Sequence, residues 1–217
     1  SSDSWDASGA MLGQDFKEKL NNLYCKYAPI EKDYTISKNE KEEAMIEWYS
    51  KCMELYFEYG LTKEKLEKSI QNSNLIFREG AKDLLQNAHK NNIPVVILSA
   101  GIGNVIEQFL KENNCYFENM YIISNFIEFE KSGNMKKFNN EKIIHTLNKT
   151  MEGHMPKEFE ERVNNKKYKL LFGDLIEDLK MVKTEDLENT LTVGFLNETS
   201  NNLKIYNDNF DIVLTRK

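Results

Sequence analysis

The chain has 217 residues, of which 40% are hydrophobic, enough to fill the core of one sizeable domain or of a core with a smaller appendage. Its 35 acidic and 29 basic residues give a formal charge of −6 and are scattered, without the basic stripe that follows a nucleic-acid backbone. This composition argues against a nucleic-acid partner but allows a small phosphorylated ligand, which needs only a few local donors.

The cysteines and the hydropathy pattern indicate the cellular setting. Cys25, Cys52 and Cys115 are odd in number and lack the spacing of a metal knuckle, so they are predicted to be reduced thiols. No stretch reaches the length of a membrane span, and the first residues lack the layout of a signal peptide. We therefore expect a cytoplasmic protein without a membrane partner. A monomer is also expected, although the sequence does not fix the oligomeric state.

The first third of the chain is predicted to be helical, because apolar residues recur three or four positions apart between residues 13 and 72. A proline-containing segment, residues 27–33, is expected to interrupt the first helix. Ser37 stands three residues before Glu40, which is the spacing of a capping box at the start of a second helix. A third helix is expected to begin near Thr62.

After residue 80, short apolar runs alternate with amphipathic helices. The runs expected to form strands are residues 94–98, 120–124, 168–172, 191–195 and 210–214. The segments between them are long enough for crossover connections, so an α/β fold with a Rossmann-like parallel sheet is predicted. The change of pattern near residue 77 divides the chain into an α-helical cap, residues 1–77, and an α/β core, residues 78–217.

The first candidate site is the connection between a strand and the helix expected over residues 104–111, which contains Ser99, Ala100 and Gly101. Such a connection presents backbone N–H groups and a hydroxyl at the carboxyl end of a parallel sheet, where anions bind. Ser99 is therefore a candidate phosphate donor. An ordinary turn, with glycines for backbone freedom, explains the same pattern.

The second candidate site is the pair of carboxylates at Asp174 and Asp178, which follow a predicted buried strand. Their spacing places them on one side of a first helical turn, where one can ligate a hard cation such as Mg²⁺ and the other can orient it or a lysine. Alternatively, these residues and Glu177 only stabilise a helix N-terminus electrostatically.

Lys149 lies between these two sites in the sequence, at the end of a helix predicted over residues 141–148. A lysine in a cluster of carboxylate and phosphate groups would neutralise the charge that builds up during phosphoryl transfer. A single lysine is more often a solvated surface residue, so its assignment depends on the neighbouring motifs.

The order of these motifs, Ser99-Ala100-Gly101, then Lys149, then Gly173-Asp174 with Asp178, resembles the second, third and fourth motifs of the haloacid dehalogenase superfamily. The resemblance is closer still to the cytosolic pyrimidine 5′-nucleotidases. Further segments similar to that family are residues 47–49, 99–103, 124–126, 148–149, 194–197 and 211–214. The resemblance covers nearly the whole chain.

The resemblance implies a Mg²⁺-dependent hydrolase that converts pyrimidine nucleoside 5′-monophosphates to nucleoside and phosphate through an aspartyl-phosphate. It implies Asp174 as the metal ligand, with Lys149 and Asp178 as catalytic residues. The substrate-binding residues that it implies are Glu31, Trp48, Cys52, Ser99, Ala100, Gly101 and Lys149. Among these, Glu31 would recognise the base and Trp48 would stack on it, unless Trp48 is a core aromatic residue of the cap.

The chain departs from the family pattern where a buried strand ending in Asp-x-Asp should carry the nucleophile. Asp3 and Asp6 are three residues apart with no apolar strand before them, so they do not form this pair. The resemblance places the missing core strand upstream of Ser1, and the chain as given is expected to be inactive. The alternatives are a catalytically inactive nucleotide-binding relative and a phosphatase for another phosphomonoester, such as phosphoserine or a methylated purine nucleotide.

Substitutions near the predicted sites leave the base preference and the metal affinity open. Leu175 and Glu177 replace small residues of the family pattern and add bulk and a negative charge beside the metal position. Cys52 and Met53 replace a serine and a histidine in the cap.

Overall fold

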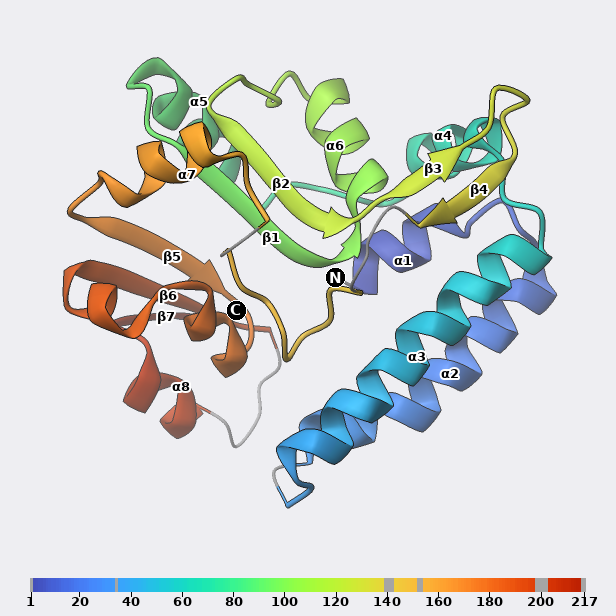
Figure 1. Ribbon diagram of the computed structural model, residues 1–217, viewed down its shortest axis with the longest axis horizontal. Coiled ribbons are helices and arrows are strands. Elements are labelled where there is room, and N and C mark those ends of the chain that lie inside the picture. Colours follow the sequence, from blue (N-terminus) through green and yellow to red (C-terminus); the bar gives the residue numbers. More distant parts are fainter. Residues whose placement is uncertain (1, 34, 139–142, 152–153, 198–202, 216–217) are drawn as a thin grey trace. The chain divides into compact units, whose positions relative to one another are not determined.

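The structure is a computed structural model that describes the whole chain except residues 1, 34, 139–142, 152–153, 198–202 and 216–217 (Figure 1). The chain folds into two compact units, Ser1–Leu147 and Asn148–Lys217, called here the N-terminal and the C-terminal unit. The boundary between these two units differs from the predicted boundary between a cap and a core near residue 77. The cap and the core stay predictions.

The N-terminal unit combines helices with a parallel strand pair and a hairpin. Its described helices are α1 (Ser2–Ser8), α2 (Gln14–Lys32), α3 (Lys38–Glu58), α4 (Lys63–Gln71), α5 (Ala81–Lys90) and α6 (Gly103–Glu112). Its described strands are β1 (Val95–Ile102), β2 (Met120–Asn125), β3 (Ile127–Phe129) and β4 (Met135–Phe138). β1 and β2 pair in parallel, whereas β3 and β4 pair antiparallel. Figure 1 shows α2 and α3 as two long helices that lie side by side.

The predicted helix starts are confirmed. Ser37 and Glu40 form both bonds of a capping box at the start of α3, and the Thr62 side chain accepts a bond from the Lys65 N–H at the start of α4. The predicted interruption of the first helix was wrong, because α2 continues through Pro29. Since Pro29 lies in the last turn of α2, the helix loses a single backbone bond there and continues.

The core of the N-terminal unit joins the helices to the end of β1. Its buried residues come from α1, α2, α3, α4, β1, α6 and the β3–β4 hairpin. Phe16 and Tyr56, both with 0% of their surface exposed, pack edge to face with ring centroids 4.9 Å apart. The Tyr56 ring also lies against Trp5 of α1, at 5.6 Å. Ala100 and Ile102 of β1 belong to the same core, so packing of the helices fixes the strand end that carries Ser99.

The C-terminal unit is built on a three-stranded parallel sheet with the order β5-β6-β7. Its strands are β5 (Lys169–Gly173), β6 (Thr190–Leu196) and β7 (Ile212–Thr215). Its described helices are α7 (Lys157–Asn164), the short 3-10 helices η1 (Ile176–Met181) and η2 (Thr184–Asn189), and α8 (Leu203–Asn209). Side chains of η1 and α8 pack with Leu196 and Val213 in one apolar cluster. The C-terminal unit is therefore a small α/β element with its own apolar core.

The α/β fold with parallel strands is confirmed, and all five predicted strands are present as β1, β2, β5, β6 and β7. The helix predicted over residues 141–148 was wrong for its described part, since residues 143–148 form no helix. The physical reason is that Asn125 takes up both the N–H and the C=O of Ile144, which removes these groups from helical bonding. α1 and the β3–β4 hairpin were not predicted.

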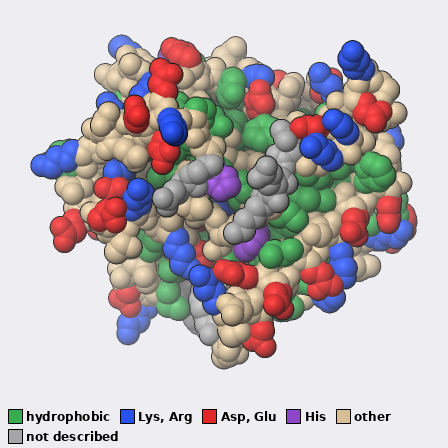
Figure 2. All heavy atoms as spheres, viewed as in Figure 1, with side chains coloured by type: hydrophobic (Ala, Val, Ile, Leu, Met, Phe, Trp, Pro, Cys, Tyr) green, Lys and Arg blue, Asp and Glu red, His purple; other side chains and the backbone are tan. Residues whose placement is uncertain are grey.

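The surface agrees with the dispersed charge of the sequence. On the face drawn in Figure 2, acidic and basic side chains are interspersed. Of the described helices, none combines the length and the apolar composition that crossing a lipid bilayer requires.

Candidate functional site

Ser99 lies near the carboxyl end of β1, within the strand and three residues before its end. β1 passes directly into α6 at Gly103. The Gly101 N–H donates to Ser99 Oγ at 3.1 Å, and the Ile102 N–H donates to Ser4 Oγ at 3.1 Å. Because Ser99 Oγ accepts this backbone bond, its hydroxyl proton can donate to an oxygen of a ligand.

The glycines of this connection allow close packing. A Cβ on Gly101 would lie 2.0 Å from Ser4 Oγ, and a Cβ on Gly103 would lie 2.5 Å from the Phe126 ring. Any larger residue would therefore displace α1 or the segment after β2. The glycines thus have a packing reason that is independent of ligand binding. Neither has the positive φ for which the backbone freedom of glycine, the reason given by the alternative interpretation, would be needed.

Asn125, at the end of β2, connects the Ser99 strand to the segment that leads towards Lys149. Its fully buried amide donates to the carbonyl of Ala100 at 3.1 Å and to that of Ile144 at 2.8 Å, and it accepts from the Ile144 N–H at 3.0 Å. The Trp5 indole N–H donates to the same Ala100 carbonyl at 3.2 Å. Sequence reasoning assigned Asn125 no role, although the segment 124–126 was one of those similar to the family.

In the C-terminal unit, Lys149 and Asp178 form a buried ion pair. Lys149 Nζ lies 2.8 Å from Asp178 Oδ1, and the two side chains are 7% and 3% exposed. Asp178 Oδ2 accepts the N–H groups of Asp174 at 3.0 Å and Leu175 at 3.1 Å. One carboxylate oxygen thus binds the ammonium group while the other holds the backbone at Asp174. Lys149 is therefore a buried, paired residue and not the solvated surface lysine of the alternative interpretation.

Gly173 is required for this arrangement. A Cβ at this position would lie 2.6 Å from Asp178 Cβ and 2.9 Å from Asp178 Oδ2. The absence of a side chain lets the Asp178 carboxylate approach the backbone of residues 174 and 175.

Asp174 directly follows β5, and its side chain is exposed while its backbone is held. Among the described residues, no group of three or more His, Cys, Asp or Glu side chains is arranged to hold a metal ion. Mg²⁺ does not need such a group, because it commonly takes one or two protein carboxylates and completes its shell with water and substrate phosphate. An exposed carboxylate oxygen with a fixed backbone suits this role.

The predicted cap residues lie on α2 and α3. Trp48 is half-buried and stacks on Tyr27, with 5.9 Å between ring centroids and 13° between planes, while Tyr24 and Tyr49 approach its ring edge-on. Glu31, near the end of α2, is partly exposed, and its carbonyl accepts from Lys41 Nζ at 3.0 Å.

Cys52 follows Trp48 by one helical turn and is buried. Burial raises the pKa of its thiol to about 12, although a bond from the Trp48 side chain acts in the opposite direction. A thiol with so high a pKa is not a nucleophile at neutral pH. In the structure, Cys52 is a packed core residue.

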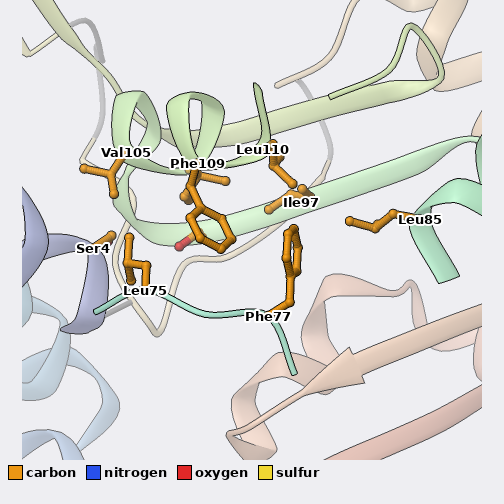
Figure 3. A pocket seen from close by; sticks show the side chains of 10 residues that line it. Ser4, Leu75, Phe77, Leu85, Ile97, Val105, Phe109 and Leu110 are labelled. Carbon is orange, nitrogen blue, oxygen red and sulfur yellow. The ribbon is translucent and has the colours of Figure 1, made fainter. Parts of the chain in front are cut away.

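A cavity of about 280 Å³ lies beside Ser99 (Figure 3). Its walls are mostly apolar and come from α1, β1, α5, α6 and the segment before α5. Its lining residues are Ser4, Leu75, Phe77, Leu85, Ile97, Ser99, Val105, Ile106, Phe109 and Leu110. The two serine hydroxyls are too few to bind a phosphate there, so the cavity suits apolar side chains.

The strand next to this cavity has an open edge along residues 95–98, before the positions where Trp5 and Ser4 bond the backbone of Ala100 and Ile102. Among the described residues, β1 is hydrogen-bonded in a ladder to β2 alone, and β5 to β6 alone. β1 begins with the run Val95-Val96-Ile97-Leu98, which is apolar on both faces, as in a strand from the middle of a sheet. An apolar strand at an open edge usually acquires a neighbour.

Parallel strands, a hydroxyl near the carboxyl end of β1, and a buried Lys149–Asp178 pair beside Asp174 define a hydrolase fold of the haloacid dehalogenase type. The model of the pyrimidine 5′-nucleotidase (UMPH-1) family matches residues 4–217. The chain belongs to this family. The 5′-nucleotidases are phosphoric monoester hydrolases, and the predicted family and enzyme class are confirmed.

Two curated relatives illustrate the similarity. A 7-methylguanosine phosphate-specific 5′-nucleotidase of Gallus gallus is 32% identical over 206 residues, which cover 94% of this chain and 71% of the relative. A putative cytosolic 5′-nucleotidase 3 of Caenorhabditis elegans is 34% identical over 217 residues, which cover 97% of this chain and 57% of the relative.

A solved structure shares the fold. The crystal structure of cytosolic 5′-nucleotidase IIIB bound to cytidine superposes with a TM-score of 0.79 at 27% identity. The match covers 96% of this chain and 72% of that structure.

Proposed function

We propose that the protein is a Mg²⁺-dependent 5′-nucleotidase that hydrolyses nucleoside 5′-monophosphates to nucleoside and phosphate. The observation that carries this proposal is the buried Lys149–Asp178 pair, whose carboxylate also holds the backbone of Asp174. Burying a charged pair costs desolvation energy, which a structural role alone repays poorly. The pair makes sense at a site where charge on a phosphoryl group must be neutralised.

Four residues of the chain have a defined task in this proposal. Lys149 would place its ammonium group against the phosphoryl oxygens, and Asp178 would keep that ammonium in position. Ser99 would donate its hydroxyl proton to a phosphate oxygen, beside the N–H groups at the start of α6. Asp174 would hold Mg²⁺, which when bound neutralises charge on the transferring phosphoryl group.

The nucleophilic aspartate is proposed to lie on a strand outside these 217 residues, which pairs with the open edge of β1. Support comes from the apolar run of β1 and from the apolar cavity beside it, which side chains of such a strand would fill. The match also covers only 71% of the Gallus gallus relative, so that relative contains further segments. This strand would place the carboxylate close to Ser99.

Two base preferences are candidates. The family description and the motifs of the sequence favour a pyrimidine nucleotide. The 7-methylguanosine phosphate-specific relatives favour a methylated purine nucleotide. The cap offers a specific reason for the second candidate, because a 7-methylguanine ring carries a positive charge, which is attracted to the π-face of Trp48 and to the carboxylate of Glu31.

The test is phosphate release from CMP, UMP, 7-methylguanosine monophosphate and phosphoserine, with and without Mg²⁺. It is run on the 217-residue chain and on the product of its full reading frame. We expect Mg²⁺-dependent release from a nucleotide by the latter, and its loss in Lys149→Met and Asp174→Asn. The controls are Lys157→Met and Asp208→Asn, which replace exposed residues of α7 and α8.

Three results would contradict the proposal in different ways. Unchanged turnover in Lys149→Met or Asp174→Asn would refute the assignment of the site. A rise in melting temperature with nucleotide, without phosphate release from either protein, would instead indicate an inactive binding relative. Faster release from phosphoserine than from every nucleotide would change the substrate class.

We also propose a cytosolic location, in line with the name of the Caenorhabditis elegans relative.

A further inference from the structure

The peptide group that joins Asp174 to Leu175 is held at both of its polar ends. Its N–H, which belongs to Leu175, donates to Asp178 Oδ2 at 3.1 Å. Its C=O, which belongs to Asp174, accepts the hydroxyl of Tyr206 on α8 at 2.5 Å. The preceding peptide group is held as well, since the Asp174 N–H donates to the same Asp178 oxygen at 3.0 Å.

These bonds fix the direction of the Asp174 Cα–Cβ bond, from which the carboxylate extends. The direction of a Cα–Cβ bond depends on the two peptide planes that flank the residue. In the plane before Asp174, Asp178 Oδ2 accepts the N–H group of Asp174. In the plane after Asp174, Asp178 Oδ2 accepts the N–H group of Leu175, and the Tyr206 hydroxyl donates to the C=O group of Asp174. Without the Tyr206 hydroxyl, the Asp174 carbonyl loses this partner and the second plane can rotate more freely.

Tyr206 is itself firmly placed. Its side chain is buried, with 9% exposure, and its ring packs on Phe210 with centroids 5.6 Å apart. The segment that follows α8 is anchored to β6 through Asp211 and Thr192. Their carboxylate and hydroxyl, with their backbone N–H groups, form three bonds of 2.8–2.9 Å. A rigid chain of contacts therefore runs from β6 through α8 to the Asp174 carbonyl.

We propose that Tyr206 is a positioning residue that holds the Asp174 carboxylate in the direction required for binding Mg²⁺. This inference rests on the proposed role of Asp174 as metal ligand and adds a residue that touches neither metal nor substrate. Groups that orient metal ligands in this way commonly change metal affinity by about 10–100-fold when removed.

The test compares Tyr206→Phe with the unchanged protein, both as the product of the full reading frame. The substitution removes the hydroxyl and keeps the ring that packs on Phe210. The matched control is Tyr168→Phe, which removes the hydroxyl of an exposed tyrosine in the same unit. Mg²⁺ binding is measured by calorimetry, and amide hydrogen exchange is measured at Asp174 and Leu175 without metal.

For Tyr206→Phe we expect Mg²⁺ binding weakened by about tenfold and faster exchange confined to residues 173–178. In the phosphatase assay the Mg²⁺ concentration for half-maximal rate should rise, while the rate at saturating Mg²⁺ is retained. A residue with a purely structural role would change exchange throughout the unit and leave the Mg²⁺ dependence unaltered. Tyr168→Phe should change none of these quantities.

Unaltered exchange, or faster exchange with unaltered Mg²⁺ affinity, would overturn the role of Tyr206. Exchange that rises throughout the C-terminal unit would overturn it as well, because Tyr206 would then act through stability. If the unchanged protein binds no Mg²⁺, the proposed metal role of Asp174 fails instead. The two failures are distinguishable, since only the second appears without any substitution.

Discussion

Lys149 Nζ lies 2.8 Å from Asp178 Oδ1, and both side chains are almost fully buried. Removing one partner leaves the other charge buried and unpaired, which typically costs 3–5 kcal/mol. Lys149→Met is therefore expected to lower the free energy of unfolding by about 3 kcal/mol. Urea unfolding measures this quantity.

The control for this substitution is Lys157→Met on the exposed surface of α7, which should stay within about 0.5 kcal/mol of the unchanged protein. A double variant that combines Lys149→Met with Asp178→Asn should be less destabilised than the sum of the two single variants. Additive effects would mean that the two side chains do not interact in solution.

Asn125 is expected to contribute more to stability than any exposed asparagine. Asn125→Leu would leave the N–H and C=O of the buried Ile144 without their partner, at a cost of about 1–3 kcal/mol for each unsatisfied group. Unfolding measured by circular dichroism should show this loss, whereas Asn87→Leu on the surface of α5 should show almost none. A loss below about 0.5 kcal/mol would show that Ile144 finds other partners.

Cys52 should resist alkylation in the native protein. Because burial raises its pKa to about 12, almost no thiolate forms at pH 8, while Cys25 is exposed. Mass spectrometry after iodoacetamide treatment should find Cys25 modified and Cys52 modified only after unfolding. Comparable rates at both cysteines in the native protein would contradict the buried position of Cys52.

The raised pKa of Cys52 also affects the stability of the protein at high pH. An unfolded cysteine has a pKa of about 8.5, so above that pH the unfolded chain releases the proton more readily than the folded chain. The contribution of Cys52 to stability is therefore complete below about pH 8.5 and is lost as the pH rises towards about 12. The pH dependence of unfolding should be weaker in Cys52→Ala over this range.

The role of Trp48 can be assigned by measuring substrate affinity and stability in the same variant. If it stacks on a charged base, Trp48→Leu should raise KM for 7-methylguanosine monophosphate by about tenfold and KM for CMP by less. If it is only a core aromatic residue packed on Tyr27, the variant should lose stability with equal KM values for both nucleotides. Phe57→Leu, which replaces an exposed aromatic residue of the same helix, is the control.

Local patterns predicted the elements that depend on neighbouring residues. The apolar runs became β1, β2, β5, β6 and β7, and the Ser37–Glu40 spacing became a capping box. Prediction failed where a distant partner decides the backbone. Residues 143–148 have a helical pattern, but Asn125 binds the backbone N–H and C=O groups of Ile144. These groups are then not available for helical hydrogen bonds, and the segment forms no helix.

The sequence by itself determined the α/β class, the family and the residue types available for phosphate chemistry, because strand patterns and the order of motifs are readable along the chain. Only the tertiary structure decided which groups meet. Asp178 contacts Lys149 across 29 residues, and Tyr206 contacts the Asp174 carbonyl across 32. Hydrogen bonds between such distant residues depend on how the sheet and helices pack, and no local pattern encodes them.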